Sequence, residues 1–241
     1  MTSLDLETPN RVLAIGAHPD DVEFGCGATL AKWAERDAEV HILVLTDGAK
    51  GTWDPSADLA ELVATRIEEQ EAAAKLLGAR DTTNLGIVDG DLSETEGVRA
   101  ALCAAIRGAR PAVVVTHDPW KRYRLHPDHR HAGFVTIDAL VAARDPHFFP
   151  EQGLEPFRPT ALLLFEADEA DHVERADATL DRKVESLLAH RSQWRSTLDI
   201  DPDDPDPGTT AFVERLRAEA ITAGALAGVP LGEAFKLLTD L

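Results

Sequence analysis

One imidazole and two carboxylates follow a short apolar run near the start of the chain, in the segment His18-Pro19-Asp20-Asp21. We expect the run Val12-Leu13-Ala14-Ile15 to be a buried strand and residues 23–36 to be a helix, so these groups lie at the carboxyl end of a strand. Open α/β sheets bind their ligands at this edge. Imidazole and carboxylate suit a divalent metal, and a carboxylate left over can act as a base. The alternative is that Asp20 or Asp21 caps the helix and the histidine fills a turn.

A second cluster of the same residue types, His126-Pro127-Asp128-His129, lies far along the chain, one loop after the run Val113-Val114-Val115. Parallel strands end at the same edge of a sheet, so the two clusters can face each other. His18, Asp21 and one histidine of the second cluster give three protein ligands, as in a catalytic zinc site that keeps one position for water. Incidental histidines at a helix start are the alternative, but two similar clusters at equivalent positions favour the metal site.

The remaining groups of the two clusters fit roles in hydrolysis. Zinc lowers the pKa of a bound water to about 7, and Asp20 beside the ligands can take its proton. A second imidazole can stabilise the oxyanion that develops on an attacked carbonyl. Asp128 lies between His126 and His129 in the sequence, and we expect it to orient His126 by accepting an N–H hydrogen bond.

Strand and helix signals alternate along the first two thirds of the chain. This order predicts an α/β fold, a Rossmann-like and mostly parallel sheet with helices on both faces. Apolar and β-branched runs mark the expected strands, and helical periodicity marks the helices. The expected strands are 12–15, 40–45, 82–87, 111–116 and 160–165, and the expected helices are 23–36, 57–77, 98–107 and 128–144.

The last third of the chain differs in character. We expect an amphipathic helix over 178–194, an Ala-rich helix over 210–226 and a short strand over 233–238. Residues 199–208 are Pro-rich and acidic but lack the Gly and Glu that an EF-hand loop requires, so we expect a solvated loop. No linker divides the chain, and we expect one domain over 1–241, with a core over about 1–165 and a helical extension over about 166–241.

Composition argues against several classes of function. A formal net charge of -19 opposes binding to nucleic acid and to anionic membranes. No apolar run approaches the ~20 residues of a membrane-spanning helix, and residues 1–10 lack the features of a signal peptide. Cys26 and Cys103 form no disulfide framework, which favours a reducing cytoplasm. No G-x-G-x-x-G follows the first strand, which argues against a dinucleotide site.

Five further side chains are weaker candidates. His117 ends the strand before the second cluster and can reach the same edge, but a capping or hydrogen-bonded role is as plausible. Trp120 and Tyr123 can stack on a sugar face or cover the edge of the core. His131 and His147 have no supporting pattern around them.

These motifs resemble the PIG-L/LmbE-like family of zinc-dependent deacetylases over most of the chain. AHPDD at 17–21 and HPDHRHAG at 126–133 resemble its first and third signatures, and this pair in this order is specific. Three supporting matches are LTDGAKG at 45–51, the Arg-x-x-Glu…Ala…Leu-Gly helix from Arg66, and Lys183…His190-Arg191-Ser192-Gln193. Within the family, THDPWKRYRLHPDHRHAGF looks most like the diacetylchitobiose deacetylase type.

The resemblance assigns roles to individual residues. The zinc ligands that it implies are His18, Asp21 and His129. It implies Asp20 as general base and acid, and His126 as the oxyanion stabiliser with Asp128 behind it. Arg66, which spacing alone would leave as a solvated charge, is implied to hold the substrate.

The implied activity is zinc-dependent removal of an N-acetyl group from a small molecule that contains N-acetylglucosamine, in the cytoplasm, by an enzyme that is a homo-oligomer if it follows the family. Leu125 stands where the mycothiol-type enzymes have a tyrosine, so the subgroup stays open. The rival enzyme is an amidase acting on a thiol-sugar conjugate. The rival of another class is a non-catalytic metal-binding sensor of small molecules, which needs no base such as Asp20.

Overall fold

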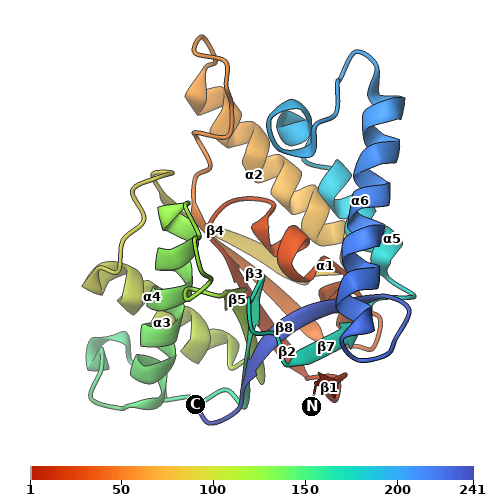
Figure 1. Cartoon of the computed structure of the whole chain (residues 1–241). Coiled ribbons are helices and arrows are strands. Elements are labelled where there is room, and N and C mark those ends of the chain that lie inside the picture. Colours follow the sequence, from red (N-terminus) through yellow and green to blue (C-terminus); the bar gives the residue numbers. More distant parts are fainter. Residues whose placement is uncertain (1) are drawn as a thin grey trace.

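The computed structural model describes residues 2–241, in which one eight-stranded mixed sheet forms the centre (Figure 1). The strand order is β1-β7-β8-β6-β5-β2-β3-β4. Strand β8 runs antiparallel to β6 and β7, and every other neighbouring pair is parallel. The strands are β1 (Ser3–Leu4), β2 (Arg11–Gly16), β3 (Glu39–Thr46), β4 (Asp81–Ile87), β5 (Val113–His117), β6 (Ala161–Phe165), β7 (His172–Arg175) and β8 (Gly232–Leu238).

Helices cover both faces of this sheet (Figure 1). The α-helices are α1 (Asp21–Ala34), α2 (Leu59–Leu76), α3 (Glu96–Ala109), α4 (Pro127–Arg144), α5 (Leu180–Leu188) and α6 (Pro205–Ala225). Asp58 and Thr95 begin α2 and α3 as side-chain caps, since each accepts hydrogen bonds from backbone N–H groups of the first turn. None of these helices is both long and apolar enough to cross a bilayer.

Strand β2 shows why two helical layers form. Its residues are apolar at every position from Val12 to Ile15, as expected of a strand buried on both faces. Val12 and Ala14 belong to the cluster that packs against α1 and α2, whereas Leu13 and Ile15 belong to the cluster that packs against α3 and α4. The period of two along the strand therefore divides one apolar run between two cores.

Strands β2 and β5 lie side by side at the point where the chain changes direction across the sheet. From β2 the chain continues outward to β3 and β4, and from β5 it continues to β6 on the other side. This is a topological switch point, where open sheets leave a crevice at the carboxyl ends of their strands. The loop after β2 carries His18, and β5 ends at His117.

The fold class is confirmed, and each strand and helix that the sequence predicts over residues 1–165 is found within a few residues of its expected bounds. The short strands β1 and β7 were not predicted, because two to four residues give too little periodicity to recognise. Residues 166–241 are not only a helical extension, since β7 and β8 continue the central sheet.

The helix expected over 178–194 ends earlier, with α5 stopping at Leu188. A short 3-10 helix, η2 (Arg191–Gln193), and a short π-helix, η3 (Trp194–Leu198), follow. Ser192 explains the change of direction, because its N–H and hydroxyl donate hydrogen bonds of 2.8 and 2.6 Å to the Glu69 carboxylate of α2. The expected acidic loop is shorter than 199–208, because α6 already begins at Pro205, a residue suited to a first helical turn.

Candidate metal centre and active site

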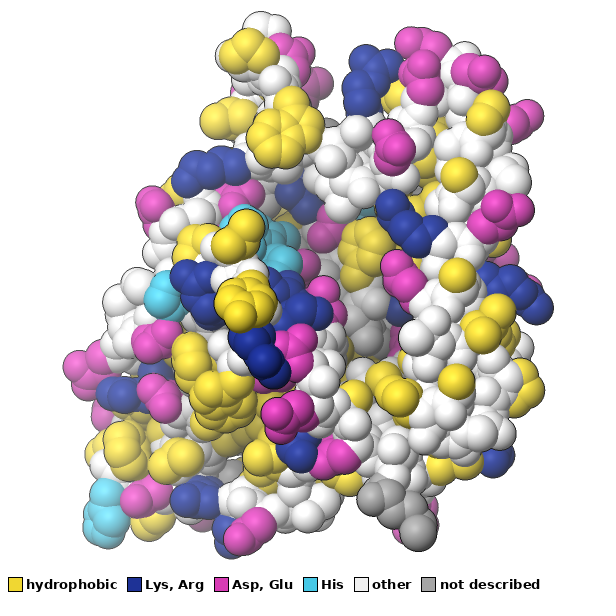
Figure 2. Space-filling view, in the orientation of Figure 1, with side chains coloured by type: hydrophobic (Ala, Val, Ile, Leu, Met, Phe, Trp, Pro, Cys, Tyr) yellow, Lys and Arg dark blue, Asp and Glu magenta, His cyan; other side chains and the backbone are white. Residues whose placement is uncertain are grey.

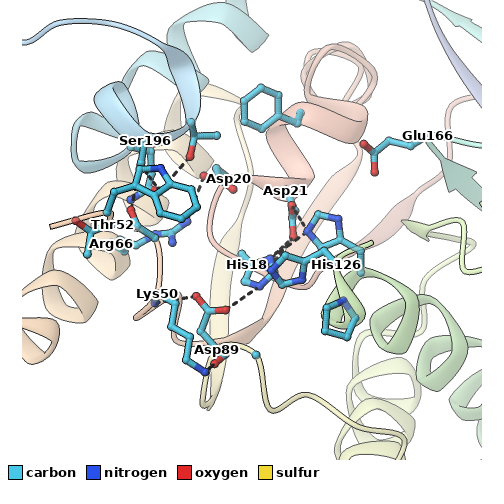
Figure 3. Close-up of a pocket in the computed structure, with 18 of the residues that line it drawn as sticks. His18, Asp20, Asp21, Lys50, Thr52, Arg66, Asp89, His126, Glu166 and Ser196 are labelled. Atoms are coloured by element: carbon cyan, nitrogen blue, oxygen red, sulfur yellow. Dashed lines mark hydrogen bonds and ion pairs between the residues drawn. The ribbon is translucent and has the colours of Figure 1, made fainter. Parts of the chain in front are cut away.

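A cavity of about 770 Å³ opens at the carboxyl edge of the sheet, over the switch point between β2 and β5. Figure 2 shows histidine side chains at the edge of a hollow that is bounded on its other side by α6. Both sequence clusters reach this cavity, as Figure 3 shows for the first cluster and for His126. The predicted residues that line it are His18, Asp20, Asp21, Arg66, His126 and His129.

The three predicted metal ligands meet at the floor of the cavity. His18 Nδ1 lies 3.2 Å from Asp21 Oδ2 and 3.2 Å from His129 Nε2, and His129 Nε2 lies 3.3 Å from Asp21 Oδ1. A tetrahedral zinc ion with bonds of about 2.0–2.1 Å holds its ligand atoms about 3.3–3.4 Å apart. The two ring nitrogens have this spacing and the Asp21 carboxylate lies beside both, so the N/O donor set fits a zinc ion with the side toward the cavity left open.

His18 is held from its far side by two carboxylates. Its Nε2 lies 3.3 Å from Asp128 Oδ2 and 3.2 Å from Asp89 Oδ1, which suits a tautomer with hydrogen on Nε2 and a free lone pair on Nδ1. Burial alone would lower the pKa of His18, but the hydrogen bonds to Asp128, Asp21 and Asp89 raise that pKa to about 12. The site thus favours positive charge at this ring, whether a proton or a metal ion supplies it.

Asp128 contacts His18 and not His126, the residue that the sequence suggested as its partner. It was expected to orient His126, but its Oδ2 instead contacts His18 Nε2 and accepts a 2.7 Å hydrogen bond from the backbone N–H of Gly90. Helix α4 begins at Pro127, so Asp128 points into the protein from the first turn while His126 stays outside at the cap position. Asp128 is therefore a positioning residue for a metal ligand.

Asp20 stands beside the ligands in a strained backbone conformation. Its φ of 99° is in the region that favours glycine, and its side chain makes no capping hydrogen bond to α1, so the helix-cap alternative does not hold for it. Instead Asp20 Oδ2 accepts a 3.2 Å hydrogen bond from Arg66 Nη2. Burial raises the pKa of the Asp20 carboxyl to about 7, although the Arg66 guanidinium opposes this.

Arg66 is buried and fixes the two loops that form the floor. Its guanidinium donates hydrogen bonds to the carbonyl oxygens of Pro19 and Gly48, at 2.6 and 2.9 Å, besides its contact with Asp20. The remaining donor, Nε, has no partner among residues 2–241. The structure thus gives Arg66 a supporting role at the cavity wall, and its contact with substrate stays a prediction.

His126 is more exposed than the three ligands and packs against two of them, edge-on to His18 and stacked on His129. Its ring centroid lies 4.7 Å from that of His18 and 4.9 Å from that of His129. Burial and the charge of His18 lower the pKa of His126, which keeps this imidazole neutral at neutral pH. A neutral ring at the mouth of the site can donate one hydrogen bond to a substrate oxygen.

Two further residues lie beside the predicted ligands, namely His117 at the end of β5 and Glu166 directly after β6. The sequence motifs assign no role to either of them. His117 Nε2 lies 3.2 Å from Asp21 Oδ2, and its Nδ1 lies 3.5 Å from Glu166 Oε2. Glu166 also accepts a 2.5 Å hydrogen bond from Arg124, and these partners overcome burial to lower the pKa of Glu166 to about 2. Glu166 directly follows β6, and this position at a strand end was the available sequence signal.

Arg124 makes one contact that metal binding must change. Its Nη1 lies 2.5 Å from His129 Nδ1, the atom that carries hydrogen when Nε2 binds a cation. Two hydrogens cannot share that space, so a cation on Nε2 would require the guanidinium to move away from Nδ1. Glu166 is a suitable acceptor because it already receives a hydrogen bond from Arg124.

Asp89 and Gln70 are further site residues that sequence reasoning missed. Asp89 follows strand β4, a third strand that ends at the same edge, and its Oδ2 accepts a 2.9 Å hydrogen bond from the N–H of Lys50. Gln70 lies one helical turn after Arg66 on α2, and its Oε1 accepts a 3.0 Å hydrogen bond from the N–H of Asp20. The strand end and the four-residue spacing were the signals that pointed to them.

Of the weaker candidates, His117 lies beside Asp21, whereas Trp120, Tyr123 and His131 lie away from the cavity lining. Trp120 and Tyr123 are 60% and 87% exposed, and neither lines the cavity. His131 pairs with Glu94 at 2.6 Å on the surface, a contact that needs no functional explanation.

Comparison with known proteins identifies relatives of this chain. The family model PIG-L, described as GlcNAc-PI de-N-acetylase, matches residues 13–140, which is more than half of the chain. The diacetylchitobiose deacetylase of Thermococcus kodakarensis is 35% identical over 187 residues, covering 76% of this chain and 70% of that protein. A 1D-myo-inositol 2-acetamido-2-deoxy-alpha-D-glucopyranoside deacetylase of Mycolicibacterium smegmatis is 32% identical over 239 residues, covering 78% and 81%.

Solved structures show the same relationship. The N,N'-diacetylchitobiose deacetylase of Pyrococcus horikoshii superposes with a TM-score of 0.86 at 31% identity, covering 96% of this chain and 84% of that one. GalB, a 4-carboxy-2-hydroxymuconate hydratase, superposes with a TM-score of 0.79 at only 18% identity, and this likeness concerns the fold alone. The family match that spans the first cluster, the second cluster and the strands between them shows that the chain belongs to the PIG-L family of deacetylases.

Proposed function

We propose that this protein is a zinc-dependent hydrolase that removes the N-acetyl group from a small molecule containing N-acetylglucosamine. The observation that carries the proposal is the convergence of three side chains at the floor of an open cavity, with Asp20 beside them. His18 Nδ1 and His129 Nε2 lie 3.2 Å apart, and each lies 3.2–3.3 Å from one oxygen of the Asp21 carboxylate. The names of the two relatives with 35% and 32% identity both specify deacetylation of an acetamido sugar.

Zinc is the metal that the donor set favours. Two imidazoles and one carboxylate are typical of catalytic zinc, whereas calcium and magnesium prefer oxygen ligands. When bound by His18, Asp21 and His129, a zinc ion would polarise the substrate carbonyl and promote ionisation of a water molecule at neutral pH. Asp89 and Asp128 would then serve to orient His18 through its other nitrogen.

Asp20 is the group that moves the proton. Its buried carboxyl has a pKa of about 7, so it can accept a proton from the attacking water and return it to the leaving nitrogen at neutral pH. Arg66 at 3.2 Å restrains the rotation of this carboxyl and limits the rise in its pKa. The same side chain thereby serves as base in the first half of the reaction and as acid in the second.

His126 would stabilise the negative charge that develops on the carbonyl oxygen. Its neutral imidazole lines the cavity beside the ligands and is not held by a hydrogen bond to Asp128. A hydrogen-bond donor placed where charge develops commonly contributes 10²–10³ in rate, to an order of magnitude. Acetate and a free amine are the products.

The direct test is amine release from a panel of N-acetylated substrates by the purified protein. N-acetylglucosamine, diacetylchitobiose and an N-acetylated thiol-sugar conjugate are assayed side by side, with chelator, without chelator, and after zinc is restored. We expect release from the acetamido sugars that is abolished by chelator and recovered with zinc. Turnover restricted to the thiol conjugate would support the rival amidase, and bound zinc without any amine release would support a sensor.

A further inference from the structure

Helix α1 is divided into two parts just after its first turn. At Cys26 the backbone leaves the helical range, with φ of −152° and ψ of 18°, and the helix kinks. The first part, residues 21–25, carries the predicted metal ligand Asp21 at the cavity, whereas the second part, residues 27–34, packs into the core through Trp33. The contacts that produce the kink therefore set the direction of the turn that carries Asp21.

A buried ion pair from the last third of the chain lies at this kink. In a continuous helix the N–H of Ala28 donates to the carbonyl of Phe24, four residues earlier. Here the Phe24 carbonyl accepts a 2.6 Å hydrogen bond from Lys183 Nζ of α5, and the Ala28 N–H donates at 3.2 Å to Glu233 Oε1 of β8. Lys183 Nζ also donates to Glu233 Oε1 at 2.7 Å. The two side chains thus bridge positions that a backbone hydrogen bond would join, and side chains inserted in this way kink a helix.

Both side chains of the pair are buried and held by several hydrogen bonds. Lys183 and Glu233 are 7% and 6% exposed. The other carboxylate oxygen, Glu233 Oε2, accepts hydrogen bonds of 2.7 and 2.6 Å from the N–H and the hydroxyl of Thr29. Gly27 allows α5 to approach closely, because a Cβ atom there would lie 3.2 Å from Lys183 Cγ. Desolvation offsets much of the attraction within a buried ion pair, so a role in fixing geometry accounts for this pair better than a gain in stability.

We propose that Lys183 and Glu233 are positioning residues for the metal ligand Asp21. They set the direction of the first turn of α1 independently of the rest of the helix, and so place the Asp21 carboxylate between the two histidine ligands. The turn is held in its middle by the hydrogen bond from Gln70 to Glu23, and Lys183 holds its carboxyl end. This inference rests on the proposed function, because it concerns the metal site of that reaction.

A second buried ion pair on the same helix supplies a matched control. Lys32, in the second part of α1, pairs with Glu174 of β7 at 2.5 Å and is 6% exposed. Neither of these two residues lines the cavity. Removing either lysine leaves a buried glutamate without its ammonium partner, so Lys183→Met and Lys32→Met should both lower stability. Stability alone therefore does not separate a positioning role from a structural one.

The first test compares zinc affinity, measured by competition with a chelator, and steady-state kinetics. We expect Lys183→Met to weaken zinc binding about tenfold, and kcat of the zinc-saturated variant to fall about tenfold with little change in KM. Lys32→Met should keep the wild-type values. The double variant Lys183→Met/Glu233→Gln removes both charges and serves if the single variant does not fold. Wild-type zinc affinity and kcat in either Lys183 variant would overturn the proposal.

The two cysteines give a readout that needs neither metal nor turnover. Cys26 lies at the kink and Cys103 lies on α3, in the core on the other face of the sheet, and both are fully buried. Their rates of reaction with a maleimide, resolved by mass spectrometry of the labelled peptides, report how often each region opens. In metal-stripped Lys183→Met we expect Cys26 to react about tenfold faster and Cys103 at the wild-type rate, because a hydrogen bond to a charged group is lost only at the kink.

The outcomes separate the proposal from the proposed function. Equal acceleration of Cys26 and Cys103 in Lys183→Met, or the same acceleration of Cys26 in Lys32→Met, would mean general destabilisation and would overturn the positioning role. Failure of the wild type to bind zinc or to release amine would instead overturn the proposed function. Faster reaction of Cys26 confined to Lys183→Met would still show that the pair holds the first turn of α1.

Discussion

The backbone N–H of Asp20 donates a 3.0 Å hydrogen bond to Oε1 of Gln70, a residue four positions after Arg66 on helix α2. Gln70 is itself fixed, because its Nε2 donates a 2.7 Å hydrogen bond to Glu23. Asp20 is thereby held through its backbone by Gln70 and through its carboxyl by Arg66. This double restraint accounts for the persistence of a positive φ at a residue other than glycine.

Replacing Gln70 should therefore impair catalysis without removing the metal. In Gln70→Leu, Asp20 loses its backbone anchor, and we expect kcat to fall about ten- to hundredfold, with KM and zinc content nearly unchanged. The exposed neighbour Glu71→Leu is the matched control on the same helix. Steady-state kinetics together with metal analysis separate the outcomes: loss of zinc, or an equal fall in Glu71→Leu, would show that Gln70 has only a structural role.

Asp20→Asn tests the proposed proton transfer. The amide keeps the shape of the side chain but cannot accept and return a proton, so we expect turnover to fall by about 10²–10⁴. Because Asp20 is not one of the three ligands, the purified variant should contain as much zinc as the wild type. Near-normal turnover by zinc-loaded Asp20→Asn would exclude this residue as the base.

Variants of Asp128 and His129 should differ in how strongly they impair zinc binding, because only His129 is a ligand. His129→Ala removes a ligand and should abolish stoichiometric zinc. Asp128→Asn weakens the hydrogen bond to His18, and we expect zinc affinity to fall about 10–100-fold, measured by competition with a chelator. The exposed Asp138→Asn on the same helix should bind zinc normally. Unchanged affinity in Asp128→Asn would mean that the contact with His18 does not support the metal.

Buried His190 predicts a pH-dependent contribution to stability. Neither ring nitrogen has a hydrogen-bond partner within residues 2–241, and burial, with a smaller effect of Arg66, lowers the pKa of His190 to about 3. Below pH 6.5 the unfolded chain binds a proton at this ring that the folded protein does not bind until about pH 3. Stability from this group is complete above pH 6.5 and is lost as the pH falls.

The measurement compares urea unfolding of metal-stripped wild type and His190→Leu at pH 7.5 and pH 5. Subtracting the two proteins removes the contributions of the titrating groups that lie away from His190. Glu23, whose Oε2 lies 3.9 Å from His190 Nε2, is the neighbouring group that the variant also affects. We expect the wild type to lose about 2 kcal/mol relative to the variant over this interval, from roughly 1.4 kcal/mol per pH unit below 6.5. A stability difference that does not change with pH would show that His190 is protonated alike in both states.

The sequence was sufficient for the parallel core and for the two clusters because both depend on local signals. Buried runs such as Val113–Val115 mark strands, and the direction of parallel strands then brings His18 and His129 to one edge. The sequence did not predict which side chains contact each other across the site. Asp128 lies two residues from His126 in the chain, but the first turn of α4 directs it toward His18 instead.

The sequence also did not predict features that are set by contacts between residues far apart in the chain. The end of α5 is set by the meeting of Ser192 with Glu69, which are 123 positions apart, and periodicity within α5 carries no record of that contact. No sequence motif distinguishes Gln70 and Asp89 from other polar residues. The fold places Gln70 beside Asp20 and Asp89 beside His18. Strands β1 and β7 form only because they pair with each other and with β8.

The metal site can form only after most of its chain has been synthesised, because its ligands lie far apart in the sequence. His18 and His129 are 111 residues apart, so no nascent segment that ends before α4 contains a complete metal site. A zinc ion in the finished site would tie two distant loops together as a removable cross-link, and its binding energy would add to the free energy of unfolding. Zinc supply would then govern how long a newly folded molecule survives protease, as well as whether it can turn over substrate.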